Sequence, residues 1–295
     1  IKVAVIGAGG KMGTRTSNNL VTKFPDKFDV KLVETFPPAV ERIEKERGLK
    51  VTPVDEALAF ADVVIFAVPD TLIKKLSAEY VPMLKPGTVF LILDPAAAVA
   101  KELTLRDDCT FGVAHPCHPS YFKWQKEEEA YQDRFGGEGG HQDIVMSCIQ
   151  GDEEKFKLAQ ETARCMYRAD KAFVMTSEQI AFLEPTLVET LGATCCYAMA
   201  ETVNEAVKRG IDREAAVSFL TGHVFNLTAN FLGYLPGNPP VSDACKVALE
   251  IGNHLVLRDD WKKIWDDELL RKVIATMLHP ETSQENLGFD VKPQK

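Results

Sequence analysis

Two histidines three residues apart are the side chains best suited to chemistry in this sequence. His115 and His118 lie in the segment AHPCHP, where each is followed by a proline and Cys117 lies between them. Imidazole titrates near neutral pH and binds divalent metals, so such a pair suits acid–base catalysis or metal ligation. The prolines restrict the backbone around the two rings. The alternative is that one histidine caps a loop and the other is simply exposed.

Two carboxylates further along the chain are candidate partners for these histidines. Glu184 and Glu189 lie in the segment FLEPTLVET. Imidazole together with carboxylate suits a divalent ion such as zinc or magnesium, so either glutamate is a candidate ligand beside His115. Both glutamates can instead be solvated at the start of a helix, where the helix dipole favours negative charge. The chain has no compact motif such as H-E-x-x-H.

A glycine-rich segment near the N-terminus predicts a dinucleotide-binding loop. The run VAVI is apolar and leads into GAGGKMG, and from about Lys11 the pattern suits a helix. Glycines allow a tight turn and close approach to a pyrophosphate, and the helix N-terminus offers unpaired N–H groups to the anion. The residues predicted to contact the cofactor here are Gly7, Gly9, Gly10, Lys11, Met12 and Gly13.

An acidic residue at the end of the second predicted strand favours NAD as the cofactor. Glu34 ends the segment FDVKLVE, about 20 residues beyond the glycines, where a carboxylate binds the ribose hydroxyls and repels a 2′-phosphate. The alternative is that Glu34 only ends a strand in solvent. Val68 and Pro69 end a further apolar strand, 61–70, and are expected to line the same cofactor site.

Strands alternate with helices through the first half of the chain. Apolar runs at 61–70, 87–98 and 109–116 predict strands buried on both faces, with helices expected at 37–48, 55–60 and 70–83. This order predicts an α/β fold, a Rossmann doubly wound parallel sheet that binds ligands at the carboxyl ends of its strands. Both histidines fall at that edge. The charged, glycine-rich segment 120–145 is expected to be a poorly structured insertion, either a lid or a solvated loop.

The second half of the chain changes to a helical period. Helices are expected from Ser177 to about Gly210, then at 212–233, 242–257 and 266–280. We therefore predict an NAD-binding Rossmann domain over 1–175 and an all-α domain over 176–295. The first of these helices is apolar nearly all round, which predicts burial by a second subunit in a homodimer.

Composition excludes several classes of function. The formal net charge of −9 argues against a nucleic-acid partner or an anionic membrane surface. No apolar run is long enough to cross a membrane. Seven cysteines, without paired C-x-x-C motifs, indicate reduced thiols and a cytoplasmic protein.

The order of a Rossmann domain and a helical domain resembles the 6-phosphogluconate and β-hydroxyacid dehydrogenase superfamily. Within it, the combination of GAGGKMG, AHPCHPSYF and FLEPTLVET resembles the D-apionate oxidoisomerase family over most of the chain. One departure from the superfamily pattern matters. Ordinary β-hydroxyacid dehydrogenases carry a catalytic lysine followed four residues later by an asparagine, whereas Glu184 and Glu189 occupy this region here.

The resemblance implies NAD-dependent oxidation of a branched sugar acid. D-apionate would be oxidised at C2, and an α-ketol migration would give 3-oxo-isoapionate, with a metal ion assisting. His115 would then be a metal ligand together with Glu184 or Glu189, and His118 would bind substrate or act in proton transfer. Two alternatives stay open: a plain NAD-dependent β-hydroxyacid or sugar-acid dehydrogenase without rearrangement, and a non-catalytic NAD sensor.

Overall fold

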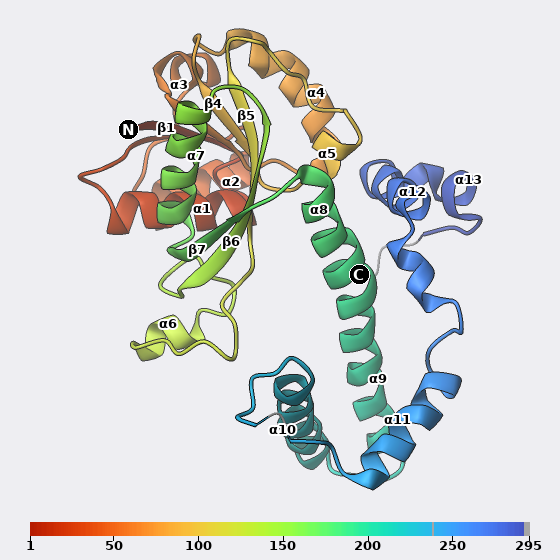
Figure 1. Ribbon diagram of the computed structural model, residues 1–295. Helices are drawn as coiled ribbons and strands as arrows, with labels where there is room; N and C mark the ends of the chain where they lie inside the picture. The colour runs from red at the N-terminus through yellow and green to blue at the C-terminus, as the bar shows by residue number, and fades with distance from the viewer. Residues whose placement is uncertain (238, 292–295) are drawn as a thin grey trace. The chain divides into compact units, whose positions relative to one another are not determined.

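The chain folds into two compact units. The computed structural model describes residues 1–237 and 239–291 (Figure 1). The larger unit comprises Ile1–Ala181 together with the segment from Arg271, and the smaller unit is Phe182–Leu270. These units differ from the predicted ranges of 1–175 and 176–295 in two ways: the larger unit continues to Ala181, and it includes the segment from Arg271.

The larger unit is built on a seven-stranded sheet in the order β2-β1-β3-β4-β5-β6-β7. The strands from β2 to β5 in this order are parallel, β6 is antiparallel to β5, and β7 is parallel to β6. The doubly wound α/β fold is thereby confirmed, with one reversal of direction. The strands are β1 Lys2–Ile6, β2 Asp29–Val33, β3 Val63–Phe66, β4 Val89–Ile92, β5 Thr110–Pro116, β6 Gln142–Gln150 and β7 Ala169–Val174.

Continuous apolar sequence places the central strands in the core. Every residue of β3 and β4 is buried, as is β1 after its first residue. Helices on both faces of a parallel sheet leave no solvated side, so these strands have no alternation of polar and apolar residues. Phe66, Phe90 and Phe111 form a row of contacting rings across β3, β4 and β5.

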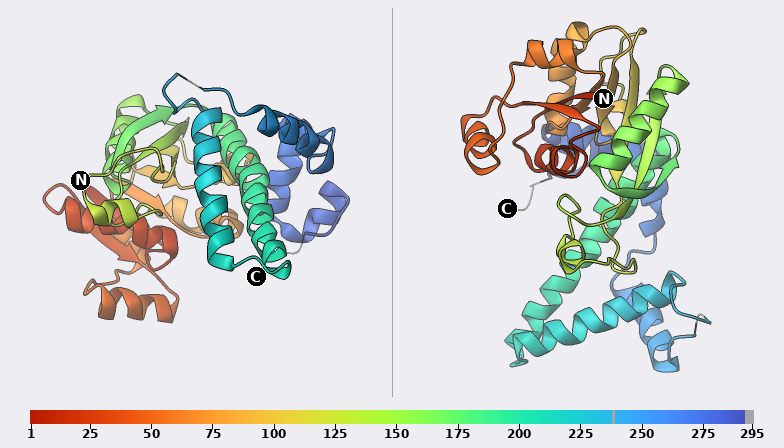
Figure 2. Two further views of the ribbon diagram at one scale, coloured as in Figure 1. Left: turned by 90° about the horizontal axis from the view of Figure 1, so that it is seen from below. Right: turned by 90° about the vertical axis from the view of Figure 1, so that its left-hand side faces the viewer.

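Helices cover the two faces of this sheet (Figures 1 and 2). Helices α1 (Lys11–Lys23) and α7 (Glu153–Met166) pack together on one face. Helix α3 (Val54–Phe60) packs against β1 and β2 and contacts η2 (Val81–Met83), which follows α4 (Asp70–Tyr80). The shorter elements of this unit are α2 Pro37–Glu41, η1 Arg42–Glu46, α5 Ala96–Val99, α6 Glu128–Gln132, α8 Ser177–Ala181, η5 Pro280–Thr282 and α13 Ser283–Leu287.

The reversal between β5 and β6 determines where the connecting segment lies. Because the two strands are antiparallel, segment 117–141 leaves and re-enters the sheet at the carboxyl edge of the parallel strands. Our expectation of a poorly structured insertion is wrong. The segment contains α6, and hydrogen bonds tie its backbone to Gln142 and Asp143 of β6 and to Asn18 of α1.

The smaller unit consists of helices. A π-helix, η3 (Phe182–Ala193), precedes α9 (Thr194–Lys208), and α10 (Arg213–Phe231) packs along α9. Helices α11 (Asp243–Leu255) and η4 (Trp261–Trp265) follow, and α12 (Asp267–Leu278) begins in this unit. The single helix expected from Ser177 is therefore divided into α8, η3 and α9. Among the described residues, no helix has the length and apolar character needed to cross a membrane.

Candidate active site

The glycine-rich loop is packed so closely that side chains are excluded. Gly7 has φ +78°, and a Cβ atom there would lie 2.5 Å from the Ala67 carbonyl oxygen. A Cβ atom on Gly13, in the first turn of α1, would lie 2.0 Å from the Gly7 carbonyl oxygen. The helix therefore rests directly on the loop. Gly10 is its N-cap and Lys11 its first residue, which is the arrangement that accommodates a pyrophosphate.

Glu34 is fixed against this loop by three backbone donors. One carboxylate oxygen accepts a hydrogen bond from the Gly9 N–H at 3.0 Å. The other accepts from the N–H groups of Thr35 and Phe36, at 2.9 and 3.0 Å. The carboxylate therefore lies beside the glycine loop, directly after β2. Oε2, which accepts only the bond from Gly9, retains a lone pair that a ribose hydroxyl can use.

The other predicted cofactor residues contribute in different ways. Val68 and Pro69 follow β3, and Val68 lies near Gly7. Met12 points inward and packs against the hydrophobic core, while its sulfur lies 3.8 Å from a guanidinium nitrogen of Arg15. The Met12 side chain therefore supports α1 from within.

His115 and Asp94 form a pair of possible metal ligands. Both are half-buried at the carboxyl edge, where Asp94 follows β4 and His115 is the penultimate residue of β5. Their ligand atoms lie within 4.8 Å of one another. His115 Nδ1 is 2.7 Å from the Leu93 carbonyl oxygen. Because a carbonyl only accepts, Nδ1 carries the proton in neutral His115, and the lone pair that a metal ligand uses is on Nε2.

Asp94 was missed in the sequence, although a signal for it was present. It ends the apolar run FLILD and is followed by Pro95. The same rule that selected His115, a polar residue just after a buried parallel strand, applies equally to this aspartate. Its carboxylate also accepts a hydrogen bond from the Ala96 N–H at 2.8 Å, which orients it.

His118 lies beyond the end of β5 in a restricted conformation. Its φ is +61°, an uncommon value for a residue with a side chain. Its Nδ1 lies 3.2 Å from the Phe135 carbonyl oxygen, and the two rings are in contact with centroids 5.4 Å apart. Nδ1 is again the donor, so in neutral His118 the lone pair is on Nε2.

The two predicted glutamates differ in exposure. Both lie in the π-helix η3, where Glu184 is half-buried and Glu189 is exposed. Backbone bonds of a π-helix join residues five apart, and the Thr190 hydroxyl follows this spacing by donating to the Pro185 carbonyl at 2.6 Å. π-Helical segments occur frequently at functional sites.

Comparisons with family models agree with this architecture. Residues 123–278 match the model described as phosphogluconate dehydrogenase (decarboxylating) C-term. Residues 1–112 match the model of the acetohydroxy acid isomeroreductase NADPH-binding domain.

Comparison with curated proteins gives a much closer relationship. The chain is 72% identical to the D-apionate oxidoisomerase of Blautia hydrogenotrophica over 285 residues, which is 96% of this chain and 99% of that protein. The chain belongs to the D-apionate oxidoisomerase family. A second member, from Cupriavidus necator, is 42% identical over 92% of this chain and 98% of its own length. Membership of this family, together with the Rossmann unit, identifies the protein as an NAD-dependent oxidoreductase.

Solved structures extend the comparison to the fold. An NAD-binding semialdehyde dehydrogenase protein from Cupriavidus necator, in complex with calcium and NAD, matches with TM-score 0.88 and 41% identity. The match covers 94% of this chain and 99% of that one. An NADH-preferring ketol-acid reductoisomerase from an uncultured archaeon matches with TM-score 0.63 at 19% identity, covering 96% of this chain and 84% of that one. This more distant likeness shows a shared fold.

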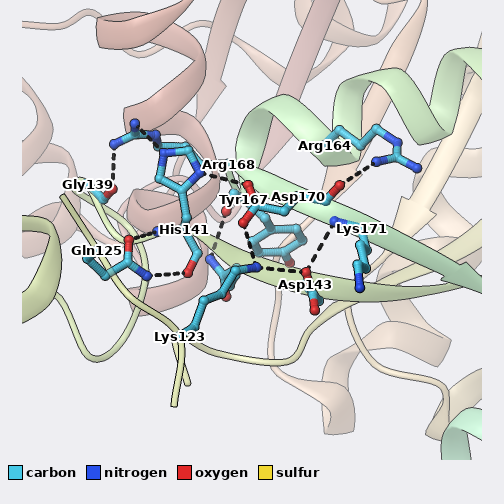
Figure 3. Close-up of polar contacts among 11 residues, drawn as sticks. Lys123, Gln125, Gly139, His141, Asp143, Arg164, Tyr167, Arg168, Asp170 and Lys171 are labelled. Atoms are coloured by element: carbon cyan, nitrogen blue, oxygen red, sulfur yellow. Dashed lines mark hydrogen bonds and ion pairs between the residues drawn. The ribbon is translucent and has the colours of Figure 1, made fainter. Parts of the chain in front are cut away.

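In this D-apionate oxidoisomerase family member, a polar cluster ties segment 117–141 to strands β6 and β7 (Figure 3). Lys123 forms ion pairs with Asp143 at 3.0 Å and Asp170 at 2.5 Å. His141 lies between Asp170 and Arg168, and Arg168 also donates to the Gly139 carbonyl.

The backbone of His141 is held as well, because the Gln125 amide bonds to both its N–H and its carbonyl. The cluster thus closes the base of the segment onto the sheet.

This cluster predicts a specific dependence of stability on acid. Burial by itself would raise the pKa of Asp170, but hydrogen bonds from Lys123 and His141 outweigh it and lower the pKa below the usual 3.8. A lowered pKa stabilises the folded state above pH 3.8, and this contribution is lost as the pH falls through the lowered value. Lys123→Met should therefore reduce the free energy of unfolding at pH 7 and flatten its decline below pH 4.

Urea unfolding between pH 2.5 and 7 measures this dependence. Lys126→Met, three residues away and exposed, is the matched control and should follow the wild-type curve. An unchanged acid dependence in Lys123→Met would show that Lys123 does not control the ionisation of Asp170.

Proposed function

We propose that this protein oxidises D-apionate at C2 with NAD and rearranges the product to 3-oxo-isoapionate. The observation that carries the proposal is the Asp94–His115 pair at the sheet edge that also holds the glycine loop. A plain dehydrogenase needs the cofactor loop and a proton acceptor, but no rearrangement step. A ligand pair of this kind at the same edge suits a reaction in which two neighbouring oxygens must be held and polarised.

The residues present fit NAD. The loop of Gly7, Gly9 and Gly13 brings backbone close to a pyrophosphate because no Cβ atom intervenes. Glu34, anchored by its backbone donors, is in place to accept from the ribose hydroxyls and to repel a 2′-phosphate. The related structure from Cupriavidus necator contains NAD.

The donor set also fits a divalent cation. Asp94 and His115 offer a carboxylate oxygen and an imidazole nitrogen, and each is oriented by a backbone hydrogen bond. We propose Glu184 as the third ligand. It lies three residues after Ala181, where the first segment of the larger unit ends, and it is half-buried, whereas Glu189 is exposed. When bound, the cation supplies Lewis-acid stabilisation of negative charge on the substrate's oxygens.

The reaction balances with these groups. In the oxidation, the C2 hydrogen leaves as hydride to the nicotinamide, and the C2 hydroxyl proton passes to a base, which we assign to Nε2 of His118. In the rearrangement, a hydroxymethyl group migrates with its bonding electrons from C3 to C2. The C3 hydroxyl loses its proton to become the ketone, and the C2 oxygen gains one to become a hydroxyl, so no further oxidant is required.

We also propose that the protein is a homodimer through its helical unit. Helix α11 has no buried residue, although Val247, Ile251 and Leu255 are apolar and lie on it. Leu255 is 80% exposed and Phe219 on α10 is 70% exposed. Faces of this kind are normally covered in soluble proteins, and a second copy is the occupant implied by the helical dimerisation domain of related enzymes. Sedimentation should give twice the chain mass of 32.7 kDa. The cytoplasmic location stays a prediction.

The reaction itself is tested by supplying D-apionate and NAD and following NADH at 340 nm, with the carbon skeleton of the product read by NMR. NADH formation with a migrated hydroxymethyl group, abolished by EDTA and restored by a divalent cation, is the expected result. NADH formation with an unrearranged 2-keto acid would instead identify a plain sugar-acid dehydrogenase. The absence of NADH formation would refute the proposed substrate.

Cation binding is tested apart from catalysis. Asp94→Asn and His115→Ala should each weaken the binding of Zn²⁺ and Ca²⁺ at least about 10-fold, measured by calorimetry on the protein alone, because each removes a ligand. Glu189→Gln is the matched control and should bind like wild type. Retained NAD affinity in all three variants excludes misfolding, and undiminished cation binding in His115→Ala would rule out this site.

Cofactor preference tests the role of Glu34. Glu34→Ala should raise the dissociation constant for NAD about 10-fold and narrow the preference over NADP, because a charged hydrogen bond to the ribose and the repulsion of a 2′-phosphate are both lost. Fluorescence titration with each dinucleotide gives both constants. Glu44→Ala, an exposed change in η1, is the control. An unchanged ratio of the two affinities would contradict the assignment.

A further inference from the structure

Asp133 forms an unusually dense set of hydrogen bonds close to the candidate site. Its carboxylate accepts from five consecutive backbone N–H groups, those of residues 136–140, at 2.8 to 2.9 Å. Four of these five residues are glycines, which on their own leave a chain with little conformational preference. The single carboxylate therefore determines the shape of the loop 136–140.

The other side of this loop is held by α1, the helix that begins at the glycine-rich cofactor loop. Arg15 is only 3% exposed, and its Nε donates to the Gly136 carbonyl at 2.8 Å. A terminal nitrogen of Arg15 donates to the Gln142 side chain at 2.7 Å. Asn18, one turn further, donates to the Gly137 carbonyl at 3.1 Å. The loop is thus fixed between Asp133 and α1.

Phe135 lies between these anchors and His118. Its carbonyl oxygen accepts from Nδ1 of His118, and its ring contacts the imidazole. The Phe135 ring also contacts two cations: Lys11 Nζ lies 4.3 Å and Arg15 Cζ 4.2 Å from its centroid. A cation over an aromatic face is an attractive and directional contact. The Phe135 backbone and ring are therefore both constrained.

We propose that Asp133 is a positioning residue, which sets the tautomer and orientation of His118 by fixing the Phe135 carbonyl. It does not touch the substrate. With Nδ1–H directed at that carbonyl, Nε2 of neutral His118 presents a lone pair in a defined direction, as a general base requires. The inference rests on the proposed function in its assignment of His118 as the base.

The Asp133 carboxylate stays ionised throughout the neutral pH range. Burial by itself would raise the pKa of Asp133, but the hydrogen bonds from Gly139, Gly140, Glu138 and Gly136 outweigh it and lower the pKa from 3.8 to about 2. The carboxylate therefore keeps its acceptors throughout the range in which a histidine titrates. Asparagine at this position replaces one acceptor oxygen with a donor that faces N–H groups.

A double-mutant cycle in the NAD-bound protein tests the proposal. Asp133→Asn should lower kcat about 10- to 100-fold, the range caused by small misplacement of a catalytic group, with the dissociation constant for NAD changed less than about 2-fold. In a His118→Ala background, Asp133→Asn should lower kcat less than about 2-fold, because the effects of two residues that act through one another are not additive. Equal losses in both backgrounds would overturn the proposal, as would full activity in Asp133→Asn. Glu138→Gln, an exposed change in the same loop, is the matched control.

A second variant and a spectroscopic readout separate positioning from folding and from the base assignment. Phe135→Leu retains the Asp133 bonds but loses the ring contacts and should lower kcat, while Phe135→Tyr retains both. Imidazole ¹⁵N shifts, assigned to His118 by their loss in His118→Ala, should report a proton on Nδ1 in wild type and a tautomer mixture in Asp133→Asn.

Failure of the positioning role of Asp133 and failure of the base assignment of His118 give different results. Unchanged ¹⁵N shifts in Asp133→Asn would refute the positioning role whatever His118 does. Full activity of His118→Ala, together with altered shifts in Asp133→Asn, would refute the base assignment in the proposed function and leave the structural link between Asp133 and His118 intact.

Discussion

The antiparallel pairing of β6 with β5 is the constraint on which the rest of the site depends. In a fully parallel sheet, the chain leaving β5 would cross to the opposite edge through a helix before the next strand begins. Here it turns back at the edge where the glycine loop, Asp94 and His115 lie, and segment 117–141 stays at that edge. The reversal therefore keeps this segment at the sheet edge that carries the candidate site. His118 belongs to the segment, whereas His115 belongs to the sheet.

Segment 117–141 is held by polar contacts more than by apolar burial. Trp124 is 83% exposed and Tyr121 is 62% exposed, so its large side chains contribute little to a core. Its stability comes from carboxylates that accept several bonds and from cations placed among carbonyls, such as Arg15. Burial lowers the pKa of Arg15, and the guanidinium keeps its charge because its ordinary pKa is far above neutrality. Removing either kind of group leaves buried polar atoms without partners, which is costly.

Much of the fold could be predicted because it follows from local patterns. Uninterrupted apolar runs mark the strands buried on both faces, and the glycines at 7, 9 and 13 lie where only a backbone without Cβ fits. The side chains of Asp212 and Ser242 accept hydrogen bonds from backbone N–H groups at the starts of α10 and α11, as is typical of these residue types.

The parts that escaped prediction depend on contacts between distant residues. The direction of β6, the role of Asp133 and the grouping of the segment from Arg271 with the larger unit have no signature in any short stretch of sequence. That grouping includes a contact of His279 with Glu102 at 2.9 Å, across 177 positions of the chain. Asp94 is different, because the sequence does contain a signal for it. It is a polar residue at the end of a buried parallel strand, the same pattern that identified His115 on the neighbouring strand.

The π-helix η3 has a consequence for how the sequence can vary. Its bonds take in one residue more per turn than those of an α-helix, and it leads without a break into α9. Each residue of a regular α-helix turns the chain by about 100°. Deleting one residue from 185–193, or inserting one, would therefore rotate every side chain of α9 about its axis relative to Glu184. Most single substitutions in this range leave that rotation unchanged, so its length should be held more strictly than its composition.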